Sequence, residues 1–215
     1  MLNKLKARRT YKVIGTPQAD SVDGETDVVR IEKILAAAGN APFHYACDRA
    51  HQADMPSCVP WRAYALGPQD CRSLMRKLIE MGDQTKVPHM LASAEYLVQV
   101  TWLPDQDRNY LDLPPDKEAP IFDGTHHNME HLAATGAFVQ SLLLAAEAEG
   151  FRTYWSSGGP LRKKPVLDWL GIPENQILIG SVFLFPEDVG SAEIKPGANA
   201  ERRGAVSDWS RWCKI

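Results

Sequence analysis

The stretch that decides the fold is residues 128–186, which contains four pieces in a fixed order. It includes LAATGAFVQSLLLAA at 132–146, GFRTYWSSGG at 150–159, LGIP at 170–173 and ILIGSVFLFP at 177–186. The first piece has only Thr135, Gln140 and Ser141 as polar side chains, so it predicts a helix that is buried on all sides. The order predicts a central helix, a small-residue turn, a short helix and a core strand. Such an arrangement can hold a flat ligand against the protein core.

Amphipathic and alternating patterns on the N-terminal side of this stretch predict further elements. Helices are expected at 27–38 and 68–81, and strands at 61–66 and 96–102. The spacing is not that of regular βαβ units, and neither a Gly-x-Gly-x-x-Gly motif nor a P-loop is present. The sequence therefore predicts an α+β fold, with a mixed, mostly antiparallel sheet packed around a central buried helix.

Bulk composition limits the classes of function. The 215 residues, numbered 1–215, are expected to form a single domain with a substantial core. A net charge of -3 gives no general attraction to nucleic acid or to an anionic membrane, and no apolar run is long enough to span a bilayer. The start of the chain lacks an apolar segment, which favours a cytoplasmic protein whose four cysteines are free thiols.

The order of the four pieces resembles the nitroreductase family, whose signature includes Trp-x-Ser/Thr-Gly and Leu-Gly-x-Pro before an Ile-Gly strand. The resemblance is to the minimal, small-chain branch, and it implies a homodimer with FMN at the subunit interface. It also implies NADH or NADPH as co-substrate and reduction of an organic acceptor, such as a quinone or nitroaromatic, by ping-pong hydride transfer through flavin N5. Trp209 and Trp212 near the end of the chain indicate that the tail from about 187 docks on another surface. The resemblance implies that this surface belongs to the partner subunit.

A basic segment near the start of the chain is the candidate phosphate site. Arg8-Arg9-Thr10-Tyr11-Lys12 is similar to the family's Arg-Arg-Ser-x-Arg, with Thr10 and Lys12 as replacements. Guanidinium groups suit phosphate because their planar forks donate paired, charge-assisted hydrogen bonds. A solvated basic terminus is the alternative. Arg202 and Arg203 are a second basic pair, which either completes the phosphate site or lies on the surface.

The resemblance also supplies candidates for contact with the flavin ring. Asn40 and His44 belong to a segment similar to Ala-Pro-x-His, which in the family reaches FMN from the other subunit. The alternative is that His44 is a loop residue with no role at the site. Backbone N–H groups of a Ser/Gly turn can approach the ring edge closely. The candidates in this turn for contact with the flavin are Trp155, Ser156, Ser157 and Gly158. Trp155 either packs below the flavin ring or is a core residue. No residue has the pattern of an obligatory acid or base, and no 2′-phosphate site selects NADPH.

Two other readings remain open. His127-Asn128-Met129-Glu130-His131 fits the His-x-x-Glu-His pattern of a zinc metallohydrolase, with Glu201 as a distant third ligand. The histidines are otherwise expected at the surface or lining a pocket. Cys47, His51 and Cys58 match no common zinc framework. Alternatively, the chain binds flavin without turning over NAD(P)H, since the stretch between His44 and Pro60 is longer than in minimal relatives.

Overall fold

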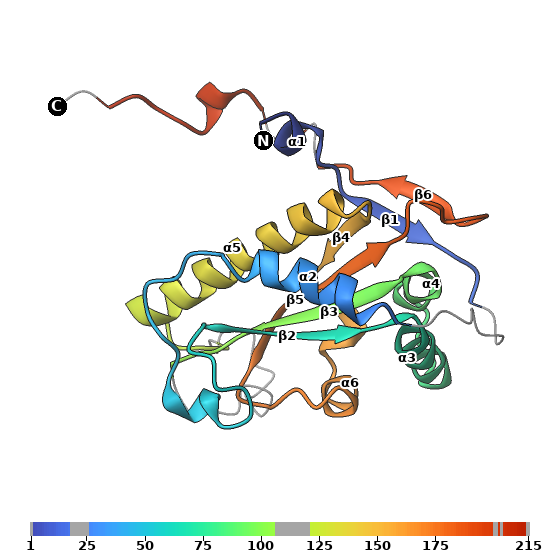
Figure 1. Cartoon of the computed structure of the whole chain (residues 1–215), viewed down its shortest axis with the longest axis horizontal. Helices are drawn as coiled ribbons and strands as arrows, with labels where there is room; N and C mark the ends of the chain where they lie inside the picture. Colours follow the sequence, from blue (N-terminus) through green and yellow to red (C-terminus); the bar gives the residue numbers. More distant parts are fainter. Residues whose placement is uncertain (1, 18–25, 106–120, 200–201, 203, 214–215) are drawn as a thin grey trace.

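Figure 1 shows the computed structural model of the chain, which describes residues 2–17, 26–105, 121–199, 202 and 204–213. Its main sheet has the order β2 (Trp61–Leu66), β3 (Tyr96–Trp102), β5 (Ile177–Phe185), β4 (Arg152–Ser156), and every neighbouring pair is antiparallel. A second sheet pairs β1 (Tyr11–Ile14) with β6 (Glu193–Pro196). A parallel bridge between Thr10 and Thr153 joins the two sheets. The strands at 61–66 and 96–102 are confirmed, as is the mostly antiparallel sheet.

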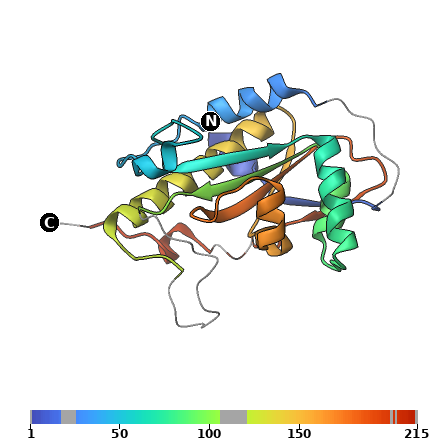
Figure 2. The same cartoon turned by 90° about the horizontal axis from the view of Figure 1, so that it is seen from below.

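The two faces of the main sheet support two separate hydrophobic cores. On one face, α2 (Val28–Ala38) and α5 (His126–Ala148) pack against alternate residues such as Val98, Val100 and Val182. On the other face, α3 (Pro68–Glu80) and α4 (Val87–Ser93) cover the intervening residues, among them Leu97 and Phe183. This division follows from the two-residue period of a strand. Figure 2 shows α2 and α5 side by side, with α3 toward the other end of the sheet.

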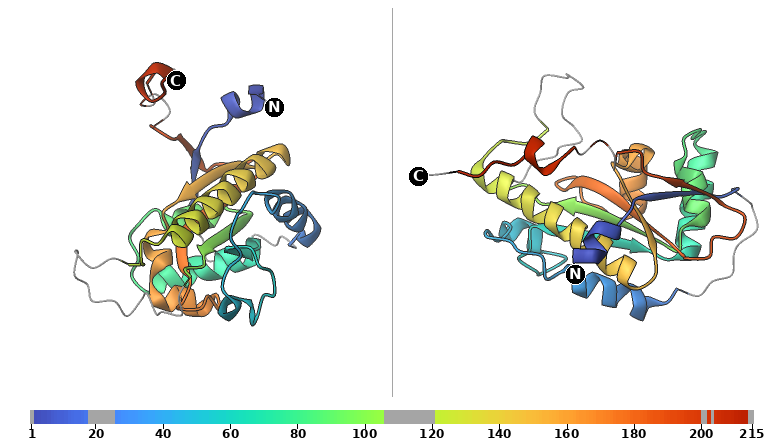
Figure 3. Two further views of the ribbon diagram at one scale, coloured as in Figure 1. Left: turned by 90° about the vertical axis from the view of Figure 1, so that its left-hand side faces the viewer. Right: turned by 90° about the horizontal axis from the view of Figure 1, so that it is seen from above.

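Short helices complete the chain. The α-helices are α1 (Leu2–Ala7) and α6 (Lys164–Trp169), and the 3-10 helices are at Arg49–Gln52, Gly159–Arg162 and Val206–Asp208. The helix expected at 27–38 begins one residue later, because Asp27 is its N-cap and accepts a hydrogen bond from the Arg30 N–H. The left view of Figure 3 shows both chain ends leaving the domain on the same side.

The apolar helix α5 is buried on only one side of the single chain. Within 132–146, Phe138, Val139 and Leu142 pack into the core, whereas Ala133 and Gln140 are exposed. Met129, before this stretch, is 57 % exposed. The expectation of burial on every side was therefore wrong for one copy of the chain. The reason is geometrical, since one sheet face and α2 cover only part of the circumference of a 23-residue helix.

The segment 150–159 is not a continuous turn. Residues 152–156 form β4, the edge strand next to β5, and the turn occupies only the residues after it. Thr153, Tyr154 and Trp155 have high strand propensity, which outweighed the glycines on either side. As a result, Tyr154 and Trp155 belong to an edge strand, whereas Phe151 before it is buried in the core.

Candidate functional site

A pocket of about 370 Å³ lies where β1, β4 and the segment after β6 meet. It brings together five residues that the sequence analysis placed at two separate motifs: Arg8, Arg9, Thr10, Lys12 and Trp155. The parallel bridge between Thr10 and Thr153 explains this convergence, because it holds the basic segment against the strand that carries the tryptophan. We call this cavity the cationic pocket.

The charged groups of the cationic pocket retain donors for an anion. Arg8 Nη1 donates to Thr10 Oγ1 at 3.5 Å, a long hydrogen bond, whereas Arg9 Nη1 is held by the carbonyls of Lys6 and Arg8 at 2.6 and 3.0 Å. The Lys12 ammonium lies 5.1 Å from the centroid of the Tyr154 ring. Three cations and one hydroxyl therefore face a cavity with two aromatic walls, which fits an anionic, partly aromatic ligand such as FMN.

A half-buried carboxylate lies near this cluster. Burial raises the pKa of Glu147, and the rise is opposed by the nearby Arg8 guanidinium and by a hydrogen bond from Thr153. Thr153 Oγ1 donates to Glu147 Oε1 at 3.4 Å. Glu147 thus places a carboxyl group close to the Arg8 guanidinium, at the end of α5.

Four lining residues were missed by the sequence analysis: Tyr154, Gly197, Ala198 and Asn199. Residues 197–199 come next to the basic segment because β6 pairs with β1 and the Gly197 N–H donates to the Thr10 carbonyl at 2.8 Å. A Cβ on Gly197 would lie 3.1 Å from Thr10 Cβ, which makes glycine the best fit there. The Pro196-Gly197 pair was the only sequence signal, and it indicates a turn rather than a site.

Trp155 is not a core residue, so that alternative was wrong. It is 40 % exposed and lies over Gly180 of β5. A Cβ on Gly180 would overlap Trp155 Nε1 and would lie 2.6 Å from the Ser156 carbonyl oxygen. Glycine at this position therefore leaves room for the indole over the neighbouring strand.

The turn after Trp155 lies beside the pocket rather than in its lining. The Gly158 N–H donates to Ser156 Oγ at 3.2 Å, and Gly158 has a φ of 106°, which favours glycine. The Ser157 carbonyl accepts a hydrogen bond from Arg162 Nε. None of Ser156, Ser157 or Gly158 lines the cationic pocket, so their contact with a flavin ring stays a prediction.

Asn40 and His44 are not brought to the cationic pocket within one chain. Asn40 Nδ2 donates to the carbonyls of Ala36 and Ala37 at 3.0 and 3.3 Å, and so closes the end of α2. His44 Nδ1 lies 3.2 Å from Glu130 Oε2, and His44 lines a cavity of about 180 Å³ against α5.

The structure describes only one member of the second basic pair. Arg202 is exposed and does not line the cationic pocket, while Arg203 and Glu201 lie outside the described residues.

The residues of the His-x-x-Glu-His pattern make hydrogen bonds and ion pairs with other parts of the chain. His131 was expected at the surface or in a pocket, but it is buried, with Nδ1 2.9 Å from the Leu103 carbonyl oxygen. His127 Nδ1 lies 3.0 Å from Asp105 Oδ2, and Glu130 faces His44. Across residues 2–17, 26–105, 121–199, 202 and 204–213, no three His, Cys, Asp or Glu side chains are placed to hold a metal ion.

The longer stretch before β2 is organised around one buried guanidinium. Arg62 is 4 % exposed, and its two terminal nitrogens donate to five backbone carbonyls at 2.7–3.0 Å. The accepting carbonyls belong to His51, Met55, Ser57, Val59 and Trp61. Arg62 Nη2 also lies 4.0 Å from the buried Cys47 Sγ. Cys47 and His51 therefore belong to a structural cluster around Arg62.

Solved structures with the same fold cover nearly the whole chain. A nitroreductase from Desulfovibrio desulfuricans, in complex with FMN, is 17% identical, with a TM-score of 0.57 over 100% of this chain and 96% of that one. NfnB from sphigopyxis sp. strain HMH, an FMN- and NADPH-dependent nitroreductase, is 13% identical, with a TM-score of 0.59 over 100% and 99%. A nitroreductase-like protein from Bacillus cereus is 18% identical, with a TM-score of 0.54 over 95% of each chain.

A search of curated proteins finds no match. Among the helices of the described residues, none is both long and apolar enough to cross a membrane. The model of the nitroreductase family matches residues 18–184, which is most of the chain. Together with the nitroreductase-like fold and the motifs from Trp155 to Pro173, this match identifies the chain as a member of the nitroreductase family.

Proposed function

We propose that this chain is an FMN-dependent oxidoreductase, which uses NADH or NADPH to reduce a small organic acceptor such as a quinone or nitroaromatic. The observation that carries the proposal is the cationic pocket. It joins the basic N-terminal segment to the exposed Trp155 at one sheet edge. A mononucleotide flavin has the matching chemistry, because it combines a phosphate dianion with a planar aromatic ring.

The residues of the pocket divide between the two parts of such a ligand. The guanidinium groups of Arg8 and Arg9 and the Lys12 ammonium bind the phosphate. The Thr10 hydroxyl donates to a phosphate or ribityl oxygen. Trp155 packs on the apolar part of the ligand and excludes water from one side of it. Bound FMN would supply the redox chemistry, and these residues orient it. The lining contains neither a carboxylate nor an imidazole, in keeping with a site that uses no side chain as acid or base.

A homodimer is part of the proposal. The outer side of α5 carries the exposed Met129 and Ala133, next to the His44 cavity, and one copy of the chain leaves these residues uncovered. A second copy packed there would bury apolar surface, which favours association. It would also bring Asn40 and His44 toward a flavin held by the partner. Sedimentation equilibrium should give a dimer, whereas a monomer at micromolar concentration would contradict this part.

Flavin affinity tests the assignment of the phosphate site. Replacing both arginines, in Arg8→Ala/Arg9→Ala, removes two cations, each making hydrogen bonds worth about 1.5–3 kcal/mol. The expected loss of FMN affinity is about 3 kcal/mol or more, which is roughly 100-fold in the dissociation constant. The matched control is Arg49→Ala/Arg76→Ala, which removes two exposed arginines outside the pocket. Equal FMN affinity in the double variant and the control would remove the assignment.

Turnover is tested separately from binding. The flavin-loaded protein should oxidise NADH or NADPH in the presence of menadione or a nitroaromatic, with parallel initial-velocity lines that indicate one pocket used in turn by both substrates. Intersecting lines with a trapped ternary complex would contradict the shared pocket. Tight FMN binding with no NAD(P)H oxidation would instead favour the alternative of a flavin-binding protein without this turnover.

A further inference from the structure

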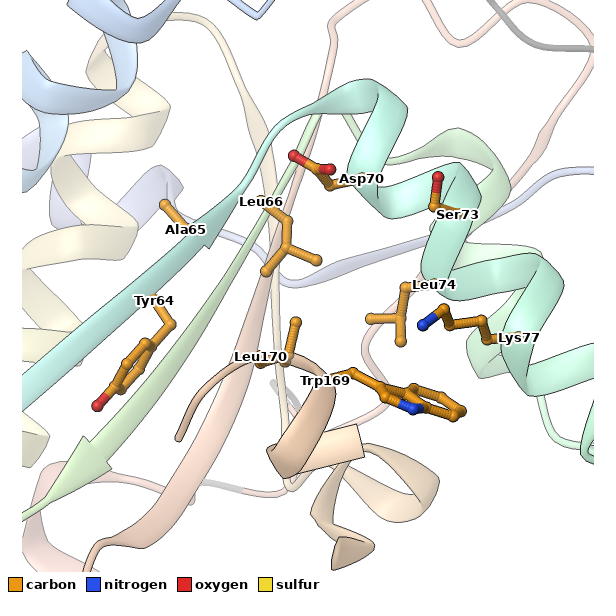
Figure 4. Close-up of a pocket in the computed structure, with 9 residues that line it drawn as sticks. All are labelled: Tyr64, Ala65, Leu66, Asp70, Ser73, Leu74, Lys77, Trp169 and Leu170. Carbon is orange, nitrogen blue, oxygen red and sulfur yellow. The ribbon is translucent and has the colours of Figure 1, made fainter. Parts of the chain in front are cut away.

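A second cavity, of about 450 Å³, is lined in part by β2, the edge strand opposite β4, and shares no lining residue with the cationic pocket. Figure 4 shows side chains from β2, α3 and the end of α6 pointing toward one space. We call this cavity the α3–α6 groove. Its volume is in the range typical of small-molecule sites.

The floor and two walls of the groove are apolar. Leu66, Leu74 and Leu170 lie at its centre, and Tyr64 and Trp169 stand on opposite sides (Figure 4). Tyr64 is held in place by the hydrogen bond from its hydroxyl to Gln176 Oε1 at 3.0 Å. The walls therefore suit a planar aromatic body, which can pack against rings without ordering flexible groups.

The Leu-Gly-x-Pro motif builds one wall. Gly171 has a φ of 64°, and the Ile172 N–H donates to the Leu167 carbonyl at 2.9 Å, so the helix ends sharply after Trp169. The Lys164 ammonium lies 2.8 Å from Asp168 Oδ1 and 2.5 Å from Glu174 Oε1, which ties α6 to the segment beyond the turn. The position of Trp169 is thus fixed by its own helix end.

The third wall is charged, with opposite signs at its two ends. Asp70 and Lys77 are on the same face of α3 and are seven residues apart, or about 10 Å along the helix axis. Lys77 Nζ lies 4.5 Å from the centroid of the Trp169 ring. Neither charge forms an ion pair with another residue in the described part of the chain. A ligand that spans the groove meets a cation at one end and an anion at the other.

We propose that the α3–α6 groove is a second binding site, which takes a planar aromatic acid carrying a hydrogen-bond donor at the end opposite its carboxylate. The carboxylate pairs with Lys77, beside the indole of Trp169. The donor, a hydroxyl or amino group, is accepted by Asp70, and the ring system lies on the leucine floor. Asp70 excludes a second carboxylate at that end, because like charges repel. The site is separate from the flavin site and does not depend on it.

The test uses 6-hydroxy-2-naphthoate as the probe, added to the full-length, FMN-saturated protein in a calorimetric titration. Saturable binding tighter than about 1 mM is expected. The comparison ligands are 6-hydroxy-2-naphthamide, which keeps the hydroxyl and lacks the charge, and naphthalene-2,6-dicarboxylate, which places a second carboxylate at Asp70. Each should bind at least about tenfold more weakly, from the loss of one charge-assisted contact or the gain of one repulsion.

Variants then locate the binding. Lys77→Met keeps the side-chain stem and should weaken the probe at least about tenfold, whereas Lys77→Arg should retain most of the affinity. Lys86→Met is the matched control, because Lys86 is exposed and lines no part of the groove. Thermal melting confirms that each variant is folded. Absence of saturable binding would overturn the proposal, as would unchanged affinity in Lys77→Met or loss of affinity in Arg8→Ala/Arg9→Ala, which would place the probe in the cationic pocket.

Discussion

Removal of the Arg62 guanidinium should destabilise the protein far more than removal of an exposed arginine. Arg62→Met keeps an apolar stem of similar length but loses all five hydrogen bonds to backbone carbonyls. The carbonyls of exposed Met55 and Ser57 can turn to water, so they add little to the loss. Those of His51, Val59 and Trp61 lie in buried or half-buried residues and lose a charged donor.

The expected magnitude follows from these three bonds. Hydrogen bonds to a charged group contribute about 1.5–3 kcal/mol each, which gives at least about 4.5 kcal/mol for three. Removing a buried charge also removes its desolvation penalty, which offsets part of the loss. The free energy of unfolding should therefore fall by about 3–5 kcal/mol in Arg62→Met. Arg62→Lys, whose ammonium has three donors, should lose roughly half as much.

Urea unfolding followed by far-ultraviolet circular dichroism measures this change, with Arg76→Met as the control. Arg76 is exposed, and its Nη2 donates to Ser73 Oγ at 3.1 Å. Limited proteolysis should cut residues 47–59 faster in Arg62→Met, because the same guanidinium holds that segment together. An unfolding free energy within about 1 kcal/mol of the Arg76→Met value would refute the reasoning, since surface changes are of that size.

Two further predictions concern the site strand and the cysteines. Gly180→Ala should displace the Trp155 indole, because a Cβ there would overlap it. The variant should show shifted tryptophan fluorescence and bind FMN at least about tenfold more weakly. The control is Gly124→Ala, whose Cβ would have no heavy atom within 4 Å, and equal FMN affinity in both variants would refute the prediction. Burial raises the pKa of the Cys71 thiol to about 12, so it stays protonated and unreactive at pH 8 in the folded protein. A disulfide exchange reagent should modify the exposed thiols first and reach Cys71 only after unfolding; fast reaction of Cys71 in the native state would contradict this.

The sequence predicted the elements whose patterns are local. The helix at 68–81 and the strands at 61–66 and 96–102 appear within one residue of their expected bounds, because hydrophobic period and caps are properties of neighbouring residues. β4 was missed because glycines on both sides of a five-residue strand indicated a turn. The exposed side of α5 was missed because the apolar composition of a helix does not show how many helices and strands pack around it.

The candidate site was predicted in part for the same reason. Arg8, Thr10 and Lys12 form a contiguous motif, and the structure places them in one pocket with Trp155. The contribution of residues 197–199 depends on the pairing of β1 with β6, which joins segments about 180 residues apart and left no local pattern. The role of Arg62 depends instead on the irregular path of residues 51–61, which brings five carbonyls to one guanidinium.

The central claim is that the cationic pocket holds FMN, and the most direct measurement is an equilibrium titration of the purified, flavin-stripped protein with FMN, followed by flavin absorbance and fluorescence. The account predicts saturable binding of one FMN per chain, with tryptophan quenching that is lost in Trp155→Phe. A protein that binds no FMN at saturating concentration, or binds it equally well after Arg8→Ala/Arg9→Ala, would contradict it.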